Sequence, residues 1–276
     1  MRTTVALTVA LGALSALMSL LPAAASAGNE PVAILVLREA GAGSTAQAQP
    51  FVDKLVGILA KLNGWPAATG KYENRRARAE EFIRQKAPHY AILSLPAFLD
   101  FRTRYRVEVV GQVDVDRAGG RRYHLVSKSA SDLAGCKGKR LATDHGDPKF
   151  IDRVASGGQF KLSDFQLIAT RRPLQTLQKV VSGEADCALV DDEQLLEVGK
   201  LEGARQVRSV WSGTKLPPMP VVAFPTAPAG ERAALQRHLG EVCQGAGKDI
   251  CAEVGMRSLK SAGPGDYATI VAAYGQ

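Results

Sequence analysis

A run of polar residues, TDHGD at positions 143–147, has the side-chain types that could bind a ligand. The apolar residues of segment 139–142 predict a short strand before it. Pro148 stands after it, where the first turn of a helix accepts proline. A turn between a strand and a helix needs only one or two such side chains. The run therefore indicates either a helix cap with several hydrogen-bonding side chains or a surface that contacts a solute.

Each side chain of this run has a functional and a structural interpretation. Thr143 could donate a hydrogen bond to a ligand from the end of the strand. Asp144 or Asp147 could cap the helix that follows, since short carboxylates accept from free N–H groups at a helix start. His145 could bind a ligand or respond to pH, or it could be a solvated loop histidine.

Other candidates come from the ends of the other predicted strands. Ligands in open α/β sheets bind beyond the carboxyl ends of the strands, where helix N-termini favour anions. Arg38 could bind a carboxylate or phosphate with its fork of donors, or simply be a surface arginine. Ser44, Thr45 and Ser94 could contact a ligand or cap helices, and Asp191 could do either.

Signatures of catalysis are missing from the sequence. It contains no HExxH, GxSxG, P-loop or dinucleotide-binding motif, so we assign no catalytic residue, metal or cofactor. The alternatives that stay open are an exported enzyme, for example a dehydratase, on the scaffold described below, and a sensory or partner-binding protein without a transport role.

The first half of the chain alternates between strand and helix patterns. Apolar runs predict strands, and apolar positions at helical spacing predict helices. We expect strands at 32–37, 67–72 and 89–94 and helices at 46–63 and 74–86.

The pattern then changes before the alternation restarts. Segments 105–115 and 121–127 read as a hairpin joined by a Gly-containing turn. After it we expect strands at 139–142, 165–169 and 187–190 and helices at 148–155, 174–182 and 192–198. Two extended segments, 206–211 and 221–224, precede a helical tail from residue 230.

This arrangement predicts an α/β fold of two lobes, each a mostly parallel sheet flanked by helices. We place the first lobe at residues 28–128 plus 213–276 and the second at 129–212. In the usual 2-1-3 strand order the strand at 139–142 neighbours the strand that begins at Cys187.

The N-terminal residues 1–27 resemble a signal peptide. Arg2 gives a positive start, an apolar stretch follows, and Ala25-Ser26-Ala27 fits the pattern that a signal peptidase cleaves. We therefore expect export to the periplasm and a mature chain that starts near Gly28.

The composition is that of a globular protein, with 46% hydrophobic and 22% charged residues. The net charge of +8 is spread along the chain without a long block of one sign. Since no aromatic residues alternate with the basic ones, nucleic acid is not an expected partner. We expect a monomer.

The chain contains four cysteines, which suits an oxidising compartment. Cys243 and Cys251 are close in sequence around a glycine-containing turn, so a bridge between them is our first expectation. Cys136 would then pair with Cys187, which the expected strand order makes plausible.

Four phrases, in the same order along residues 31–225, resemble those of periplasmic solute-binding proteins of ABC transporters. "DLAGCKGKRLATDHGDPKF" resembles their "dLkGKrvA" strand with its loop and helix, and "VVSGEADCALVDDEQL" resembles their "GeaDaalvd" strand. "PHYAILSLPAFL" resembles the first-lobe strand and turn, and "LPPMPVVAFP" the returning strand. The closest group is the phosphate- and phosphonate-binding proteins.

The resemblance implies a type 2 periplasmic-binding fold that closes on a small solute and delivers it to a membrane permease. In phosphonate-binding members the loop after the "GKrvA" strand is typically Ser-x-Thr-Ser-Gly, and here only Thr143 and Gly146 match. The aspartates of the run would repel a bare anion. We therefore expect an anionic or zwitterionic solute, and a zwitterion or polyol to fit better than phosphate.

Overall fold

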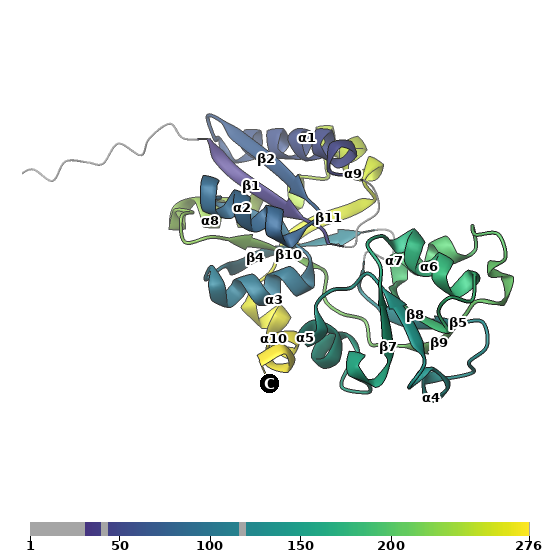
Figure 1. Ribbon diagram of the computed structural model, residues 1–276. Coiled ribbons are helices and arrows are strands. Elements are labelled where there is room, and N and C mark those ends of the chain that lie inside the picture. Colours follow the sequence, from purple (N-terminus) through teal and green to yellow (C-terminus); the bar gives the residue numbers. More distant parts are fainter. Residues whose placement is uncertain (1–30, 40–43, 116–119, 276) are drawn as a thin grey trace, which may run out of the picture.

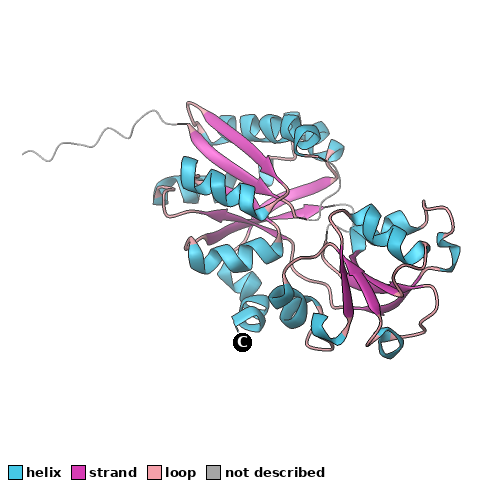
Figure 2. Cartoon of the chain, viewed as in Figure 1, coloured by secondary structure: helices cyan, strands magenta, loops and turns pink. Residues whose placement is uncertain are grey.

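The computed structural model describes residues 31–39, 44–115 and 120–275. They form two lobes, each built on one β-sheet with helices packed on it (Figures 1 and 2). The predicted two-lobed α/β fold is confirmed. In the part of the chain that is described, no helix combines the length and apolarity needed to cross a membrane.

The sheet of the first lobe consists of β1 (Val32–Leu37), β2 (Ala68–Glu73), β3 (Tyr90–Leu93), β4 (Glu108–Val115), β10 (Met219–Ala223) and β11 (Met256–Ser261). Their order is β11-β4-β10-β3-β1-β2. β1 is apolar in every residue and buried throughout, as expected of a parallel strand covered on both faces. The pairs of β1 with β2 and β3 are parallel, whereas β10 pairs antiparallel with β3 and β4.

Helices cover both faces of this sheet. One face carries α1 (Thr45–Asn63), α8 (Ala229–His238) and α9 (Lys248–Glu253), and the other carries α2 (Arg76–Lys86) and α3 (Leu95–Arg104). α1 begins at a capping box between Ser44 and Gln47 and ends at Gly64, whose positive φ of 66° suits glycine.

The sheet of the second lobe consists of β5 (Tyr123–Ser127), β6 (Arg140–Thr143), β7 (Gln166–Ala169), β8 (Cys187–Asp191) and β9 (Arg208–Ser212) in the order β7-β6-β8-β5-β9. β6 lies between β7 and β8 and is parallel to both, so the predicted strand order is confirmed. α6 (Pro173–Val181) and α7 (Asp192–Val198) cover one face. The other face packs against α4 (Leu133–Cys136), α5 (Pro148–Phe150) and the π-helical turn η1 (Ile151–Ala155).

Three details of the predicted architecture are wrong. The expected hairpin does not form, because β4 pairs within the first sheet and β5 pairs with β8 and β9 in the second. The second sheet thus already includes Tyr123–Ser127, which the predicted boundary at 128 had assigned to the first lobe. The tail, predicted to be helical, contains the strand β11 among its helices; both sheets combine parallel with antiparallel pairs.

Both predicted disulfides are confirmed. Cys136 in α4 pairs with Cys187 in β8, and Cys243 pairs with Cys251 in α9. The Cα atoms are 6.0 and 5.5 Å apart, within the range that disulfides require.

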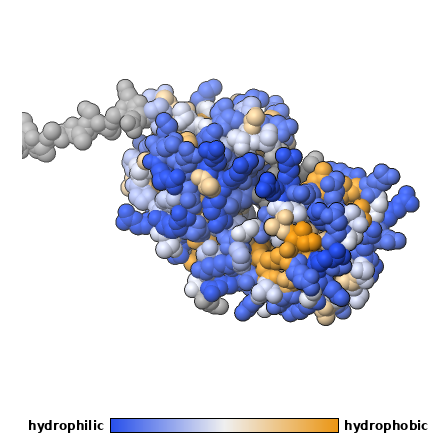
Figure 3. All heavy atoms as spheres, in the orientation of Figure 1, coloured by the Kyte–Doolittle hydropathy of each residue, from blue (hydrophilic) through white to orange (hydrophobic). Residues whose placement is uncertain are grey.

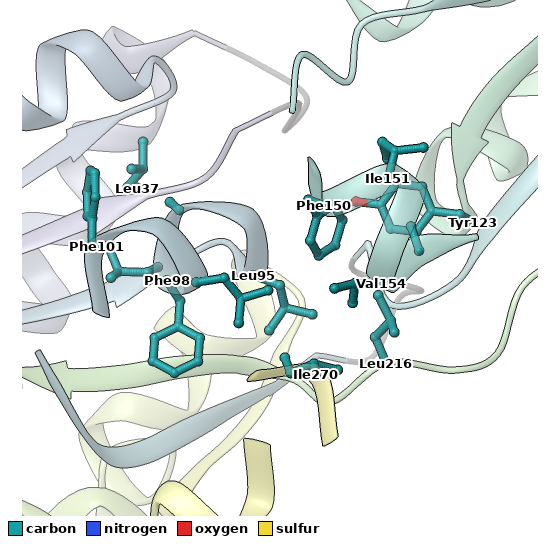
Figure 4. Close-up of a cluster of buried hydrophobic side chains, with 14 of the residues drawn as sticks. Leu37, Leu95, Phe98, Phe101, Tyr123, Phe150, Ile151, Val154, Leu216 and Ile270 are labelled. Atoms are coloured by element: carbon teal, nitrogen blue, oxygen red, sulfur yellow. The ribbon is translucent and has the colours of Figure 1, made fainter. Parts of the chain in front are cut away.

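A shared apolar cluster joins the two lobes. Leu95 of α3 and Ile270 of α10 (Ala268–Gly275) belong to the same buried cluster as Phe150 and Val154 of the second lobe (Figure 4). The Lys149 ammonium also lies 4.3 Å from the centre of the Tyr274 ring. The C-terminal helix α10 therefore packs against the second lobe, although the chain just before it belongs to the first lobe.

Candidate functional site: a charged cleft between the lobes

A cleft of about 390 Å³ lies where the two lobes face each other. The carboxyl ends of β1, β2 and β3 in the first lobe and of β6, β7 and β8 in the second lead into it, as the rule for open α/β sheets requires. On the face shown in Figure 3, hydrophilic residues lie along part of the boundary between the lobes, and an apolar patch of the second lobe adjoins it. The charged lining residues are Arg38, Glu39, Arg76, Arg121, Asp144, Asp147, Arg171, Asp191 and Glu193.

Arg76, the first residue of α2, links the lobes through carboxylates. Its Nε and Nη2 donate to Glu39 at 2.9 and 3.0 Å, and its Nη1 donates to Asp147 of the second lobe at 3.1 Å. Ser94 Oγ donates to the same Glu39 carboxylate at 2.9 Å. Burial lowers the pKa of Arg76, but the hydrogen bonds to Glu39 and Asp147 outweigh burial and raise the pKa. The guanidinium therefore stays protonated.

A second ion pair crosses the cleft from the end of β1. Arg38 donates to Glu193, which lies in the first turn of α7. Tyr72 of β2 lies nearby: burial raises the pKa of its hydroxyl, the Arg38 charge opposes that rise, and Glu193 adds to it. Two cation–carboxylate contacts therefore link the lobes at the cleft.

Helix N-termini at the cleft are capped by aspartates of the chain itself. Asp147 accepts a hydrogen bond from the N–H of Phe150 at 2.9 Å in α5, and Asp191 accepts from the N–H of Gln194 at 2.8 Å in a capping box of α7. An anionic ligand could bind these two N–H groups only by displacing the aspartate side chains that already accept hydrogen bonds from them.

Asp144 and Thr143 are occupied by structural hydrogen bonds. Asp144 accepts from Thr176 Oγ1 at 3.1 Å and from Gln194 Nε2 at 3.2 Å, which ties the loop after β6 to α6 and α7. Thr143 is buried, and its Oγ1 accepts from the N–H of His145 at 3.1 Å, which fixes the turn.

Three titratable side chains lie close together on the second lobe's side of the cleft. The rings of Tyr123 and His145 meet edge to face with centroids 4.9 Å apart, and burial raises the pKa of Tyr123 well above its usual value. Burial raises the pKa of Asp191 to about 6, although the neighbouring His145 opposes the rise. His145 Nε2 is buried without a hydrogen-bond partner in the described part of the chain. Such an unpartnered nitrogen at a cleft wall is a natural contact for a polar ligand.

Two arginines complete the lining. Arg121 lies on the crossing between the lobes, where its Nε donates to the carbonyl of Leu216 at 3.0 Å and its guanidinium lies 3.5 Å from Asp114. The side chain of Arg171, after β7, is exposed and makes no ion pair with a described residue. Arg171 is therefore available to an anionic group of a solute.

The structure brings five of the predicted residues to the cleft: Arg38, Ser94, Asp144, His145 and Asp191. The other three lie elsewhere. Ser44 caps α1, Thr45 is the first residue of that helix, and Thr143 lies beneath the loop that lines the cleft.

Sequence reasoning missed Glu39, Arg76, Tyr123 and Arg171. The strand-end rule would have found Arg76 and Arg171, because they follow β2 and β7. Tyr123 was hidden by the incorrect hairpin.

Comparison with solved structures identifies the fold. A binding protein component of an ABC phosphonate transporter from Pseudomonas aeruginosa matches with a TM-score of 0.66, 16% identity, and coverage of 87% of this chain and 84% of that one. PhnD1 from Prochlorococcus marinus in complex with methylphosphonate gives 0.62, 13%, 87% and 96%. The aliphatic sulphonate binding protein SsuA from Escherichia coli gives 0.61, 12%, 87% and 90%.

Neither family models nor curated proteins give a match to this sequence. At these identities the structural likeness establishes the fold alone. The chain therefore has the two-lobed fold of periplasmic binding proteins.

Proposed function

We propose that this chain is an exported solute-binding protein that captures a small anionic or zwitterionic solute between its lobes. The observation that carries the proposal is the cleft at the facing carboxyl ends of two sheets, lined by charged side chains of both lobes. Binding by closure of the lobes involves no chemistry, so the absence of catalytic motifs from the sequence agrees with it.

The charges of the cleft favour a zwitterion over a bare anion. Four arginines and five carboxylates line it, and Arg38 and Arg76 are already paired with carboxylates. Arg171 is free to bind an anionic group, while the carboxylate of Asp191 and the ring nitrogen of His145 offer polar contacts on the same lobe. A solute that carries both an anionic group and a donor, such as an amine or hydroxyl, can bind Arg171 with the first and Asp191 or His145 with the second.

The further proposal concerns location and partners. The signal-peptide pattern at residues 1–27 and the two disulfides support export to the periplasm with cleavage near Ala27. The fold supports delivery of the solute to an ABC transporter permease in the membrane. We propose that the protein acts as a monomer without a cofactor.

Thermal-shift screening followed by calorimetric titration tests the proposal. The panel contains phosphate, phosphonates, sulfonates, amino acids and polyamines, and a ligand at 100 times its dissociation constant stabilises the native state by about 2.7 kcal/mol. We expect solutes with an anionic group and a donor to raise the melting temperature most. If no small solute in the panel raises it, the proposal fails.

The variant Arg171→Ala locates the binding to the cleft. Removing a charge-assisted contact to the solute should weaken binding about tenfold. The matched control is Arg172→Ala, because Arg172 is also exposed but does not line the cleft. Equal affinities in the two variants would contradict a role for Arg171.

A further inference from the structure

A second cavity, of about 290 Å³, lies inside the first lobe beside the charged cleft. It is open to solvent and is bordered by the α1 face of the sheet, by α1 itself and by α9 with the start of β11. Its walls are mostly aliphatic and aromatic, with Val36 and Ile92 from the sheet, Phe51 and Leu55 from α1, and Ile250 from α9. Walls of this kind favour apolar groups, because contact with them removes apolar surface from water.

Close packing and a disulfide fix two walls of this cavity to the lobe. α1 rests directly on β2, where a Cβ at Gly70 would lie 2.6 Å from the side chain of Val52, so helix and strand are in the closest contact that glycine permits. The disulfide between Cys243 and Cys251 anchors α9, and Cys251 itself lines the cavity. Two walls of the cavity, α1 and α9, are therefore each fixed to the rest of the lobe.

The cavity lies next to the charged cleft. Arg38, Arg121 and Met219 line both spaces, so the mouth of the apolar cavity carries two guanidinium groups. A solute that reaches from the cleft into the cavity would thus place its charged part near the arginines and its apolar part among the side chains of α1 and the sheet. A solute that fills both spaces is therefore amphipathic, with its charged part in the cleft and its apolar part in the cavity.

We propose that this cavity holds the hydrocarbon part of the solute, so that the ligand of this protein is a small amphipath with a charged head and an unbranched aliphatic or a flat aromatic tail. The inference rests on the proposed function for the position of the head in the cleft. The tail site stands on the apolar cavity itself. Burial of each added methylene should tighten binding about fourfold until the cavity is full.

A homologous series of ligands tests the inference. The probes are unbranched 2-aminocarboxylic acids and n-alkanoic acids of two to ten carbons, titrated calorimetrically at fixed pH and ionic strength. We expect the affinity to rise about fourfold per methylene and then to reach a plateau. An affinity that does not change with chain length, or the failure of every member to bind at millimolar concentration, would overturn the inference.

Two variants of α1 provide a matched comparison. Ala48 lines the cavity, so Ala48→Phe should abolish the gain from the longer chains and leave the shortest members unchanged. Ala46 is exposed on the same helix and does not line the cavity, so Ala46→Phe should behave like the wild type. Should Ala48→Phe not fold, Val254→Asp serves instead, because Val254 lines the cavity yet is 37% exposed. Equal chain-length dependence in the lining and control variants would also overturn the inference.

The design separates this inference from the proposed function. Small polar solutes that bind without any gain from a tail would leave the proposed function intact and remove the tail site. Long-chain members that bind equally well in Arg171→Ala, while no short polar solute binds, would support the cavity and remove the cleft as the site of the head.

Discussion

Replacing Asp147 by asparagine should weaken the attraction between the lobes without removing a helix cap. Asp147 uses Oδ1 to cap α5 and Oδ2 to accept from Arg76 Nη1 at 3.1 Å. Asparagine is as good a cap as aspartate, and its Oδ1 can keep that role. Its amide nitrogen then replaces Oδ2 and turns a donor toward the guanidinium of Arg76, so the interlobe hydrogen bond is lost.

The magnitude follows from the partial burial of the pair. The side chains of Arg76 and Asp147 are 23% and 13% exposed, so the contact lies between an exposed ion pair and a buried charge-assisted hydrogen bond. We estimate a loss of about 1–2 kcal/mol in the closed arrangement. Such a loss lowers the ratio of closed to open molecules by about 5- to 30-fold and weakens a ligand that needs closure by up to that factor.

The assay is small-angle X-ray scattering of the unliganded protein, combined with titration of any solute found in the screen. Asp147→Asn should increase the radius of gyration, and raising the salt concentration should move the wild type in the same direction. The control is Asp132→Asn, because Asp132 is an exposed aspartate that caps α4 through the N–H of Gly135. Identical scattering and identical affinity in Asp147→Asn and Asp132→Asn would refute the reasoning.

Three further predictions use other parts of the structure. The pKa of Asp191 is raised from 3.8 to about 6, chiefly by burial. The protonated carboxyl therefore contributes stability that is fully present below about pH 4 and is lost as the pH rises through about 6. Asp191→Asn keeps the cap and should therefore be about as stable as the wild type at pH 4 but more stable by up to about 3 kcal/mol at pH 7 in urea unfolding; a difference that is the same at both pH values would contradict this. Converting Cys136 and Cys187 together to alanine opens a loop spanning 51 residues and should cost about 4 kcal/mol, against about 2.5 kcal/mol for the Cys243 and Cys251 pair that spans 8, so the reverse order in unfolding experiments would contradict the loop-entropy argument. Mass spectrometry of the chain isolated from the periplasm should find an N-terminus near Gly28, and an intact Met1 there would exclude the predicted cleavage.

Local features of the fold could be predicted because their causes are local. The apolar run of β1, the capping box at Ser44 and the caps at Asp147 and Asp191 depend on neighbours within a few residues. The pairing of Cys136 with Cys187 required one long-range step, the usual 2-1-3 strand order, and the structure confirms both the order and the pairing.

The hairpin prediction failed for a reason that local pattern cannot reveal. Segments 105–115 and 121–127 are extended and joined by turn residues, which suits a hairpin. Every residue of β5 is nevertheless buried, because β5 runs between β8 and β9 inside the second sheet. β11 was missed for the opposite reason: it is an edge strand with a single buried residue, so its hydrophobic pattern is weak.

The sequence by itself determined that the chain forms two α/β lobes with aspartates, a histidine and an arginine at the strand ends, because strand and helix patterns and cap positions are properties of short segments. Only the tertiary structure decided which side chains face each other across the cleft. The contacts of Arg76 with Asp147 and of Arg38 with Glu193 join residues 71 and 155 positions apart, and their energy depends on the burial that closure of the lobes creates. The apolar cavity beside the cleft was likewise invisible in the sequence, because an unfilled space is a property of packed elements and not of any one of them.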